Sequence, residues 1–229
     1  MGNFPGYIEI LLDPKGMAFW FVVLVASLAT TIFFFLNVAN RDALDDTMKV
    51  ASGNNSMIGL FDLCGPHRTR IEQSRAFSPP ERLWCYDNEY LDKFKAAASS
   101  RTTIFGDTGL AHYVRPTLMW KDIGFAIAMA AFTTSAAIGL AGLLPWQPWA
   151  GYIMLFAAFM GVFYGVADVA EDLKLVAIFE NPEPVDPGDA TTARTLTRLK
   201  IATLSVSGVG GLAFLLLNTV ANLLKRLNA

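Results

Sequence analysis

The chain has few of the residues that metal sites and catalytic sites most often use. Its 229 residues include only two histidines, His67 and His112, and two cysteines. Neither histidine lies in a long apolar stretch, so haem or chlorophyll ligation by a histidine within the membrane is not expected. The sequence also lacks a Cys-x-x-Cys pair, a phosphate-binding glycine loop followed by lysine, and a His-Glu-x-x-His motif. We therefore expect no cofactor, with a bound lipid or pigment as the alternative.

Charged residues are absent from four long stretches. Hydrophobic residues make up 53% of the chain and charged residues 17%, which is too apolar for an ordinary soluble domain. About 20 helical residues span the roughly 30 Å hydrocarbon core of a bilayer. The charge-free stretches of about this length are Met17–Val38, Ile123–Leu144, Trp149–Ala167 and Ile201–Leu224. Because lipid offers the backbone no hydrogen bonds, we expect an all-α integral membrane fold with four transmembrane helices.

The four expected helices divide the chain into parts of different character. The first stretch has the small residues of a signal peptide, but its length and the preceding Glu9 and Asp13, against a lone Lys15, favour a retained anchor. The expected parts are an interfacial N-terminal segment (1–16), helix 1 (17–39), a hydrophilic loop domain (40–119), helix 2 (120–145), helix 3 (148–173), a proline-rich acidic connector (174–200), helix 4 (201–224) and a C-terminal tail (225–229).

The loop domain is the only hydrophilic part large enough to fold on itself. A core of this size is marginal, so we expect the loop to lean on the membrane helices or on a partner. Residues 41–50 are one helical candidate. A second is residues 82–99, which follow Pro79-Pro80 and carry Leu83, Trp84, Tyr90, Leu91 and Phe94. The segment Gly106–Gly109 is expected to be a loop, and Asp189 or Thr191 is expected to cap the last helix.

Polar residues are expected to gather at one end of the helices. The start of helix 2, the end of helix 3 and the start of helix 4 share one side of the membrane, together with Asn37, Asn40, Arg115 and Lys174. We expect a network of ion pairs and hydrogen bonds there, with a metal or proton site as the alternative, and we assign no catalytic residue and no metal ligand. The expected interfacial polar cluster is Lys121, Asp122, Asp168, Glu171, Asp172, Arg198 and Lys200.

Small residues at a spacing of four predict close helix packing. Gly161 and Gly165 lie on one stripe of helix 3, directly before Asp168 and Asp172. Small residues allow helix backbones to approach one another closely in a membrane. Helix 4 repeats the pattern with Thr203, Ser207 and Gly211, and helix 2 repeats it with Ala131, Ser135 and Gly139.

The two cysteines and the basic residues predict opposite orientations of the chain in the membrane. If the loop domain lies outside the cytoplasm, Cys64 and Cys85 are expected to form a disulfide. Lysines and arginines near the membrane ends are more numerous on the loop side, which favours a cytoplasmic loop. The charge rule weakens for long loops, so we favour the external loop and keep the other orientation as an alternative.

Two resemblances follow from local sequence. The run Trp120–Gly124 opening helix 2 and the run Gly165–Leu173 closing helix 3 resemble a group of uncharacterised bacterial four-helix membrane proteins. This resemblance implies a fold but no activity. Gly59–Cys64 together with Cys85 resembles the first loop of claudin-like four-helix proteins, although that pattern has Trp where this chain has Phe61. A claudin-like chain would be associated with junctions or channels.

These patterns favour a binding role over an enzymatic one. We expect a non-enzymatic accessory or scaffold subunit of a larger membrane assembly, in a bacterial inner membrane. Its expected partners are membrane lipids and other membrane protein subunits. Nucleic acid is not expected, because residues 40–119 carry ten basic and ten acidic residues. A small transporter or channel component is the first alternative, and a membrane enzyme using the interfacial carboxylates is the second.

Overall fold

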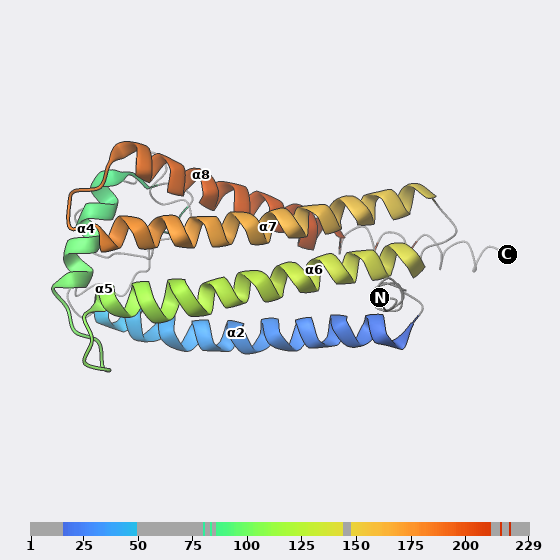
Figure 1. Ribbon diagram of the computed structural model, residues 1–229, viewed down its shortest axis with the longest axis horizontal. Helices are drawn as coiled ribbons and strands as arrows, with labels where there is room; N and C mark the ends of the chain where they lie inside the picture. Colours follow the sequence, from blue (N-terminus) through green and yellow to red (C-terminus); the bar gives the residue numbers. More distant parts are fainter. Residues whose placement is uncertain are drawn as a thin grey trace, which may run out of the picture. The chain divides into compact units, whose positions relative to one another are not determined.

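The computed structural model describes residues 16–49, 80, 83, 86–143, 148–211, 216 and 220. Every regular element within these residues is helical (Figure 1), which confirms the expected all-α fold. The elements in chain order are α2 (Met17–Lys49), α4 (Asn88–Ser99), α5 (Gly109–His112), the π-helical segment η2 (Tyr113–Asp122), α6 (Ile123–Leu143), α7 (Pro148–Glu180), α8 (Pro187–Leu204) and the π-helical segment η3 (Ser205–Gly210).

Three helices of the described chain are long and apolar enough to cross a membrane. They are Met17–Ala39, Gly109–Ala141 and Gly151–Glu180, which overlap the first three predicted stretches. Of the fourth predicted stretch, the structure describes residues 201–211, 216 and 220, all of them helical. The interfacial segment (apart from Gly16), the C-terminal tail, Trp84, Cys64 and Cys85 lie outside the described residues.

The helices extend further than the apolar stretches that predicted them. α2 continues to Lys49, so the helix predicted near residues 41–50 is a continuation of the first helix. α7 continues to Glu180 and α8 already begins at Pro187. The connector expected over 174–200 is therefore reduced to residues 181–186. In the loop, α4 begins at Asn88, because Asp87 caps it by accepting a 3.0 Å hydrogen bond from the Tyr90 N–H.

The second membrane-length helix begins at Gly109, eleven residues before its expected start at 120. α5, η2 and α6 form one continuous helical run even though Pro116 lies inside it. Proline has no N–H, so the carbonyl of His112, four residues earlier, loses its usual α-helical donor. The Thr117 hydroxyl donates to that carbonyl at 3.2 Å. The π-helical segment η2 thus accommodates the proline, and the helical run continues into α6.

The chain divides into two compact units. The first unit contains the described residues of 1–31, 127–165 and 200–229, and the second contains those of 32–126 and 166–199. α2, α6 and α7 each contribute to both units, and the boundary of α8 falls between Leu199 and Lys200.

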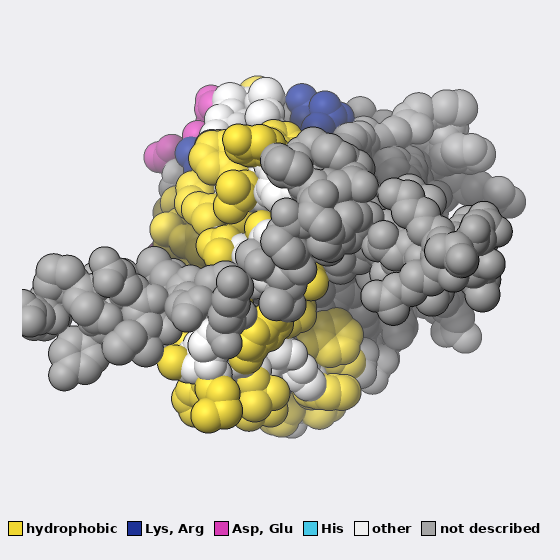
Figure 2. Space-filling model, turned by 90° about the vertical axis from the view of Figure 1, so that its right-hand side faces the viewer, with side chains coloured by type: hydrophobic (Ala, Val, Ile, Leu, Met, Phe, Trp, Pro, Cys, Tyr) yellow, Lys and Arg dark blue, Asp and Glu magenta, His cyan; other side chains and the backbone are white. Residues whose placement is uncertain are grey.

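The first unit is built from apolar helix segments with small residues between them. Its buried cluster consists of Ala137, Ala157 and Ala158, with Ile138 packed beside them. The ring of Phe19 lies against Gly139, where an added Cβ would come within 2.6 Å of the ring. The small residue therefore lets α2 approach α6 closely. On the face seen in Figure 2, described side chains are mainly hydrophobic and charged ones show only along the upper edge.

α2 is the least covered of the three membrane-length helices. Only 11% of its most apolar window is buried, against 44% for the corresponding window of α7. Several of its large side chains, among them Phe21, Leu24 and Leu28, are more than half exposed. α2 therefore presents a long apolar face to its surroundings.

The second unit has the main hydrophobic core of the described chain. Leu83, Leu91 and Phe94 are fully buried, together with Leu118 and Leu175. At its centre three rings from distant segments meet: the Phe94, Tyr113 and Phe179 centroids lie 5.2, 5.5 and 5.6 Å apart in pairs. In Figure 1, α4 lies across the end of α7 where the chain turns into α8. The described part of the loop domain thus packs against a membrane-length helix.

Replacing Phe94 by alanine should detach α4 from this core. The substitution removes a fully buried ring that contacts both Tyr113 and Phe179, so we expect a loss of about 3 to 5 kcal/mol of stability. The exposed Lys93, which forms an ion pair with Glu89 one turn away, is the matched control, and its replacement by alanine should cost less than about 0.5 kcal/mol. Thermal unfolding in detergent measures both, and equal losses would contradict the packing described.

Candidate functional site

Buried polar side chains in the second unit form the candidate site. Asn37 of α2 and Asp122 at the end of η2 are 4% and 5% exposed. The Asn37 amide donates to Asp122 Oδ1 at 2.7 Å and to the carbonyl of Lys121 at 3.2 Å. It ties α2 to the segment that opens α6.

A second buried contact joins α7 to α8 and to the residue that precedes α4. Glu171 and Thr197 are both fully buried, and the Thr197 hydroxyl donates to Glu171 Oε1. The Tyr86 hydroxyl lies 3.0 Å from Thr197 Oγ1. Because a threonine hydroxyl has one proton and it points to the carboxylate, Tyr86 is the donor of the second bond. Tyr86, Thr197 and Glu171 therefore form a directional chain, which we call the Glu171 relay.

α4 also holds the short connector between α7 and α8. Asp92 Oδ1 accepts from the backbone N–H of Val185 at 2.9 Å. The Lys95 ammonium donates to the carbonyls of Asn181 and Glu183. The backbone groups of the connector are thus satisfied by side chains of α4, which fixes the turn from α7 into α8.

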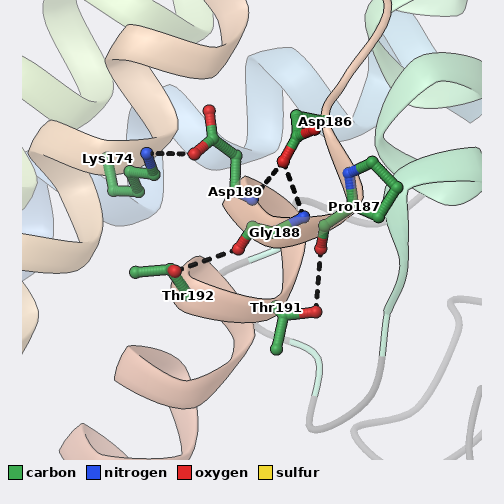
Figure 3. Close-up of polar contacts among 7 residues, drawn as sticks. All are labelled: Lys174, Asp186, Pro187, Gly188, Asp189, Thr191 and Thr192. Atoms are coloured by element: carbon green, nitrogen blue, oxygen red, sulfur yellow. Dashed lines mark hydrogen bonds and ion pairs between the residues drawn. The ribbon is translucent and has the colours of Figure 1, made fainter.

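The start of α8 is fixed by a different cap from the one expected. Asp186, and neither Asp189 nor Thr191, caps the helix: its Oδ1 accepts from the N–H groups of Gly188 at 2.7 Å and Asp189 at 3.3 Å (Figure 3). Pro187 follows in the first turn, where its fixed φ suits a helix and no donor is lost. The Asp189 carboxylate instead pairs with Lys174 of α7 at 2.5 Å.

The acidic residues of the expected interfacial polar cluster are all buried. Asp168 is 5% exposed, and Glu171 and Asp172 are fully buried on the same stripe of α7. Asp122 meets Asn37 and the Lys121 carbonyl, as described above. Arg198 and Lys200 are partly buried on α8, and Lys200 falls in the first unit. In the part of the chain that the structure describes, no group of three or more His, Cys, Asp or Glu side chains is arranged to hold a metal ion.

Several residues that build the site were not singled out from the sequence. They are Tyr86, Asp92, Lys95, Asp186 and Thr197. The dipeptide Asp186-Pro187 is a recognisable helix start, with a capping carboxylate before a proline. The other four residues show no local pattern, because their partners lie far away in the sequence. Near them, burial lowers the pKa of the Arg101 guanidinium, although arginine remains charged at neutral pH.

In the first unit, the predicted packing residue Gly161 lies against three hydroxyl groups. A Cβ added to Gly161 would lie 2.6 Å from Thr133 Oγ1, 2.9 Å from Thr134 Oγ1 and 3.3 Å from Ser207 Oγ. Thr203 and Ser207 are buried with it, whereas Gly211 has open space where its side chain would be, and Gly165 is buried on α7. α6 and η3 therefore both pass close to α7 at Gly161.

Replacing Thr197 by valine should break the Glu171 relay without changing side-chain volume. The fully buried Glu171 loses a donor and the Tyr86 hydroxyl loses its acceptor, so we expect a loss of about 1 to 3 kcal/mol. Thr195, which is exposed and donates to the Thr191 carbonyl of its own helix, is the control. Thr195→Val should change the melting temperature little. If both variants melt together, the relay does not stabilise the fold.

Replacing Gly161 by alanine should separate the helices that meet there. The new methyl group would overlap the hydroxyls of Thr133 and Thr134, and we expect a loss of about 1 to 3 kcal/mol. Gly151 lies on the same helix with nothing within 4 Å of an added Cβ, so Gly151→Ala should be neutral or slightly stabilising. Adding Thr133→Ala should partly restore Gly161→Ala. Thermal unfolding of the four proteins measures this, and tolerance of Gly161→Ala would contradict the close approach.

Comparison of this chain with protein-family models, with curated proteins and with solved structures finds no match. The resemblances to bacterial four-helix membrane proteins and to claudin-like proteins therefore stay predictions. What the chain does has to be inferred from its own residues.

Proposed function

We propose that this chain is a four-helix integral membrane protein and a non-enzymatic accessory or scaffold subunit of a larger membrane assembly. The proposal is supported by the contacts that polar side chains make within the second unit. The Glu171 relay, the Asn37–Asp122 bond and the contacts of Asp92 and Lys95 all join segments of the chain to one another. These contacts fix the arrangement of the segments that they join. We call the described part of the second unit, within residues 32–126 and 166–199, the polar head.

Membrane insertion is supported by the three membrane-length helices and by the apolar face of α2. The charge-free residues 201–224 supply the fourth crossing in this proposal, continuing from α8 and η3. At about 1.5 Å per residue, the 33 residues of α7 extend about 50 Å, well beyond a hydrocarbon core of about 30 Å. The excess length lets the helix carry the polar head outside the bilayer. We place the protein in a bacterial inner membrane, as its resemblance to bacterial four-helix proteins suggests.

An accessory subunit needs surfaces for other proteins, and the described chain has two kinds. α2 presents a continuous row of large apolar side chains, suited to lipid or to a neighbouring membrane helix. The polar head presents a surface whose backbone is held by side-chain contacts, so that binding need not order it first. A rigid surface beside a membrane helix is what a scaffold offers to its partners.

Purification from native membranes tests this function. The tagged full chain, extracted in a mild detergent and examined by native mass spectrometry, should carry other membrane subunits in fixed ratio. Phe94→Ala, which loosens the head, should lose these subunits, and Lys93→Ala should keep them. Recovery of the wild-type chain as a stable monomer with nothing bound would overturn the proposal.

A transporter or channel component is the second candidate. It is favoured by the burial of four carboxylates, Asp122, Asp168, Glu171 and Asp172, beside helices long enough to cross a membrane. Buried ionisable groups near membrane spans often mark ion or proton pathways. Solute flux through liposomes containing the purified chain alone, abolished by Asp168→Asn, would favour this candidate over the accessory role.

A further inference from the structure

A tight turn between α4 and α5 exposes two large apolar side chains. In this 101–108 turn, the Thr103 N–H donates to the Asp107 carbonyl at 2.8 Å, and the Gly106 N–H donates to the Thr103 carbonyl at 3.0 Å. Gly106 has a φ of +88°, which glycine adopts without strain. Ile104 and Phe105 at the tip are 80% and 63% exposed. The turn is therefore a defined structure with an apolar tip.

A histidine lies beneath this tip. His112, in the first turn of the helical run that follows, is only 5% exposed. Its ring is nearly parallel to the ring of Phe105, with an interplanar angle of 13° and centroids 5.3 Å apart. Its Nε2 is buried and has no hydrogen-bond partner among the described residues. The imidazole thus acts as an apolar support for Phe105.

The surroundings of His112 suit the neutral imidazole. Protonation would make both ring nitrogens donors, and Nε2–H would then be buried without an acceptor in the described part of the chain. Burying an unpartnered charge is costly. Two charged groups act on the ring: Lys121 of η2 opposes protonation, and Asp107 of the turn favours it.

We propose that His112 makes the 101–108 turn a pH-sensitive element. The neutral imidazole supports Phe105 and keeps the turn closed. The protonated imidazole leaves its place beneath Phe105 to reach water, and the turn opens. Ile104 and Phe105 then lose the fixed position that the closed turn gives them.

The direction of the effect follows from linkage between protonation and opening. In the open turn His112 is hydrated and titrates near the ordinary histidine value of about 6.5, whereas the closed turn binds the proton less readily. The closed turn is therefore fully favoured above about pH 6.5. Below that pH, its ratio to the open turn should fall about tenfold per pH unit until the closed form itself becomes protonated.

Hydrogen exchange of the full chain in detergent tests this device. The amides to follow are Thr103, Gly106 and Gly109, which the closed turn hydrogen-bonds. After correction for intrinsic exchange rates, their protection should fall about tenfold between about pH 7.5 and about pH 5.5 in the wild type, with about half of the open form already protonated at about pH 6.5. His112→Phe keeps an aromatic ring without a titrating group, so its protection should not change with pH. His112→Gln is a second non-titrating variant in case the phenylalanine does not fit.

His67→Phe is the matched control, because His67 is the only other histidine of the chain. It should keep the wild-type response. Equal protection of the turn at the two pH values in the wild type would overturn the proposal. So would a similar fall in the non-titrating variants, or a parallel fall in the amides of α4, which would indicate general unfolding caused by carboxylates.

Discussion

The meeting of Phe94, Tyr113 and Phe179 is the contact on which the second unit depends. The three rings belong to α4, η2 and α7, and the last of them, Phe179, lies far along the sequence from the other two. A segment the size of the loop domain has only a marginal core by itself. The buried side chains of α7, such as Leu175 and Val176, enlarge this core. The membrane-length helix thus contributes part of the core of the hydrophilic part.

Around this core, hydrogen bonds set the register that apolar packing leaves loose. Hydrophobic burial is not directional, so by itself it fixes the position of α4 along α7 less sharply than hydrogen bonds do. Asp92 and Lys95 select one position, because they meet particular backbone groups of residues 181–185. The Glu171 relay does the same for α8. Burying a carboxylate contributes little net stability, so its main effect here is to make one arrangement of the segments preferable to the others.

The sequence predicted the fold class and three membrane-length helices because those features depend on local composition. Runs such as Met17–Val38 contain no charged residue. Such a run has to form a helix in a membrane whatever the rest of the sequence is, because lipid offers its backbone no hydrogen bonds. The helix limits were harder to predict. Asp168, Glu171 and Lys174 suggested that α7 was ending, yet the helix continues to Glu180 with Leu175, Val176, Ile178 and Phe179 on its buried side. Residues 113–119, expected in the hydrophilic loop domain, similarly belong to the π-helical segment η2.

The candidate site could be predicted only in part. Connectivity alone indicated that Asp122 and the carboxylates of α7 belong to one end of the helices, and the structure buries them all in the second unit. Which groups they contact could not be foreseen. Thr197 looks like any other threonine of a threonine-rich helix, and only the fold shows that it faces Glu171 while Thr195 faces outward. Such pairings depend on the rotation of each helix about its axis, which polar sequence patterns do not fix.

The long sequence separation of these contacts has a consequence for how the protein is made. Tyr86 and Thr197 are 111 residues apart, and Asp92 and Val185 are 93 apart. A ribosome adds about 5 to 20 residues per second, so α4 leaves the ribosome about 5 to 20 s before the partners that hold it. During that time two further apolar helices are synthesised. α4 therefore has to stay soluble before its partners are made. Its charged residues Glu89, Asp92, Lys93 and Lys95 favour solubility during that time, and Asp92 and Lys95 also form the contacts of the folded state.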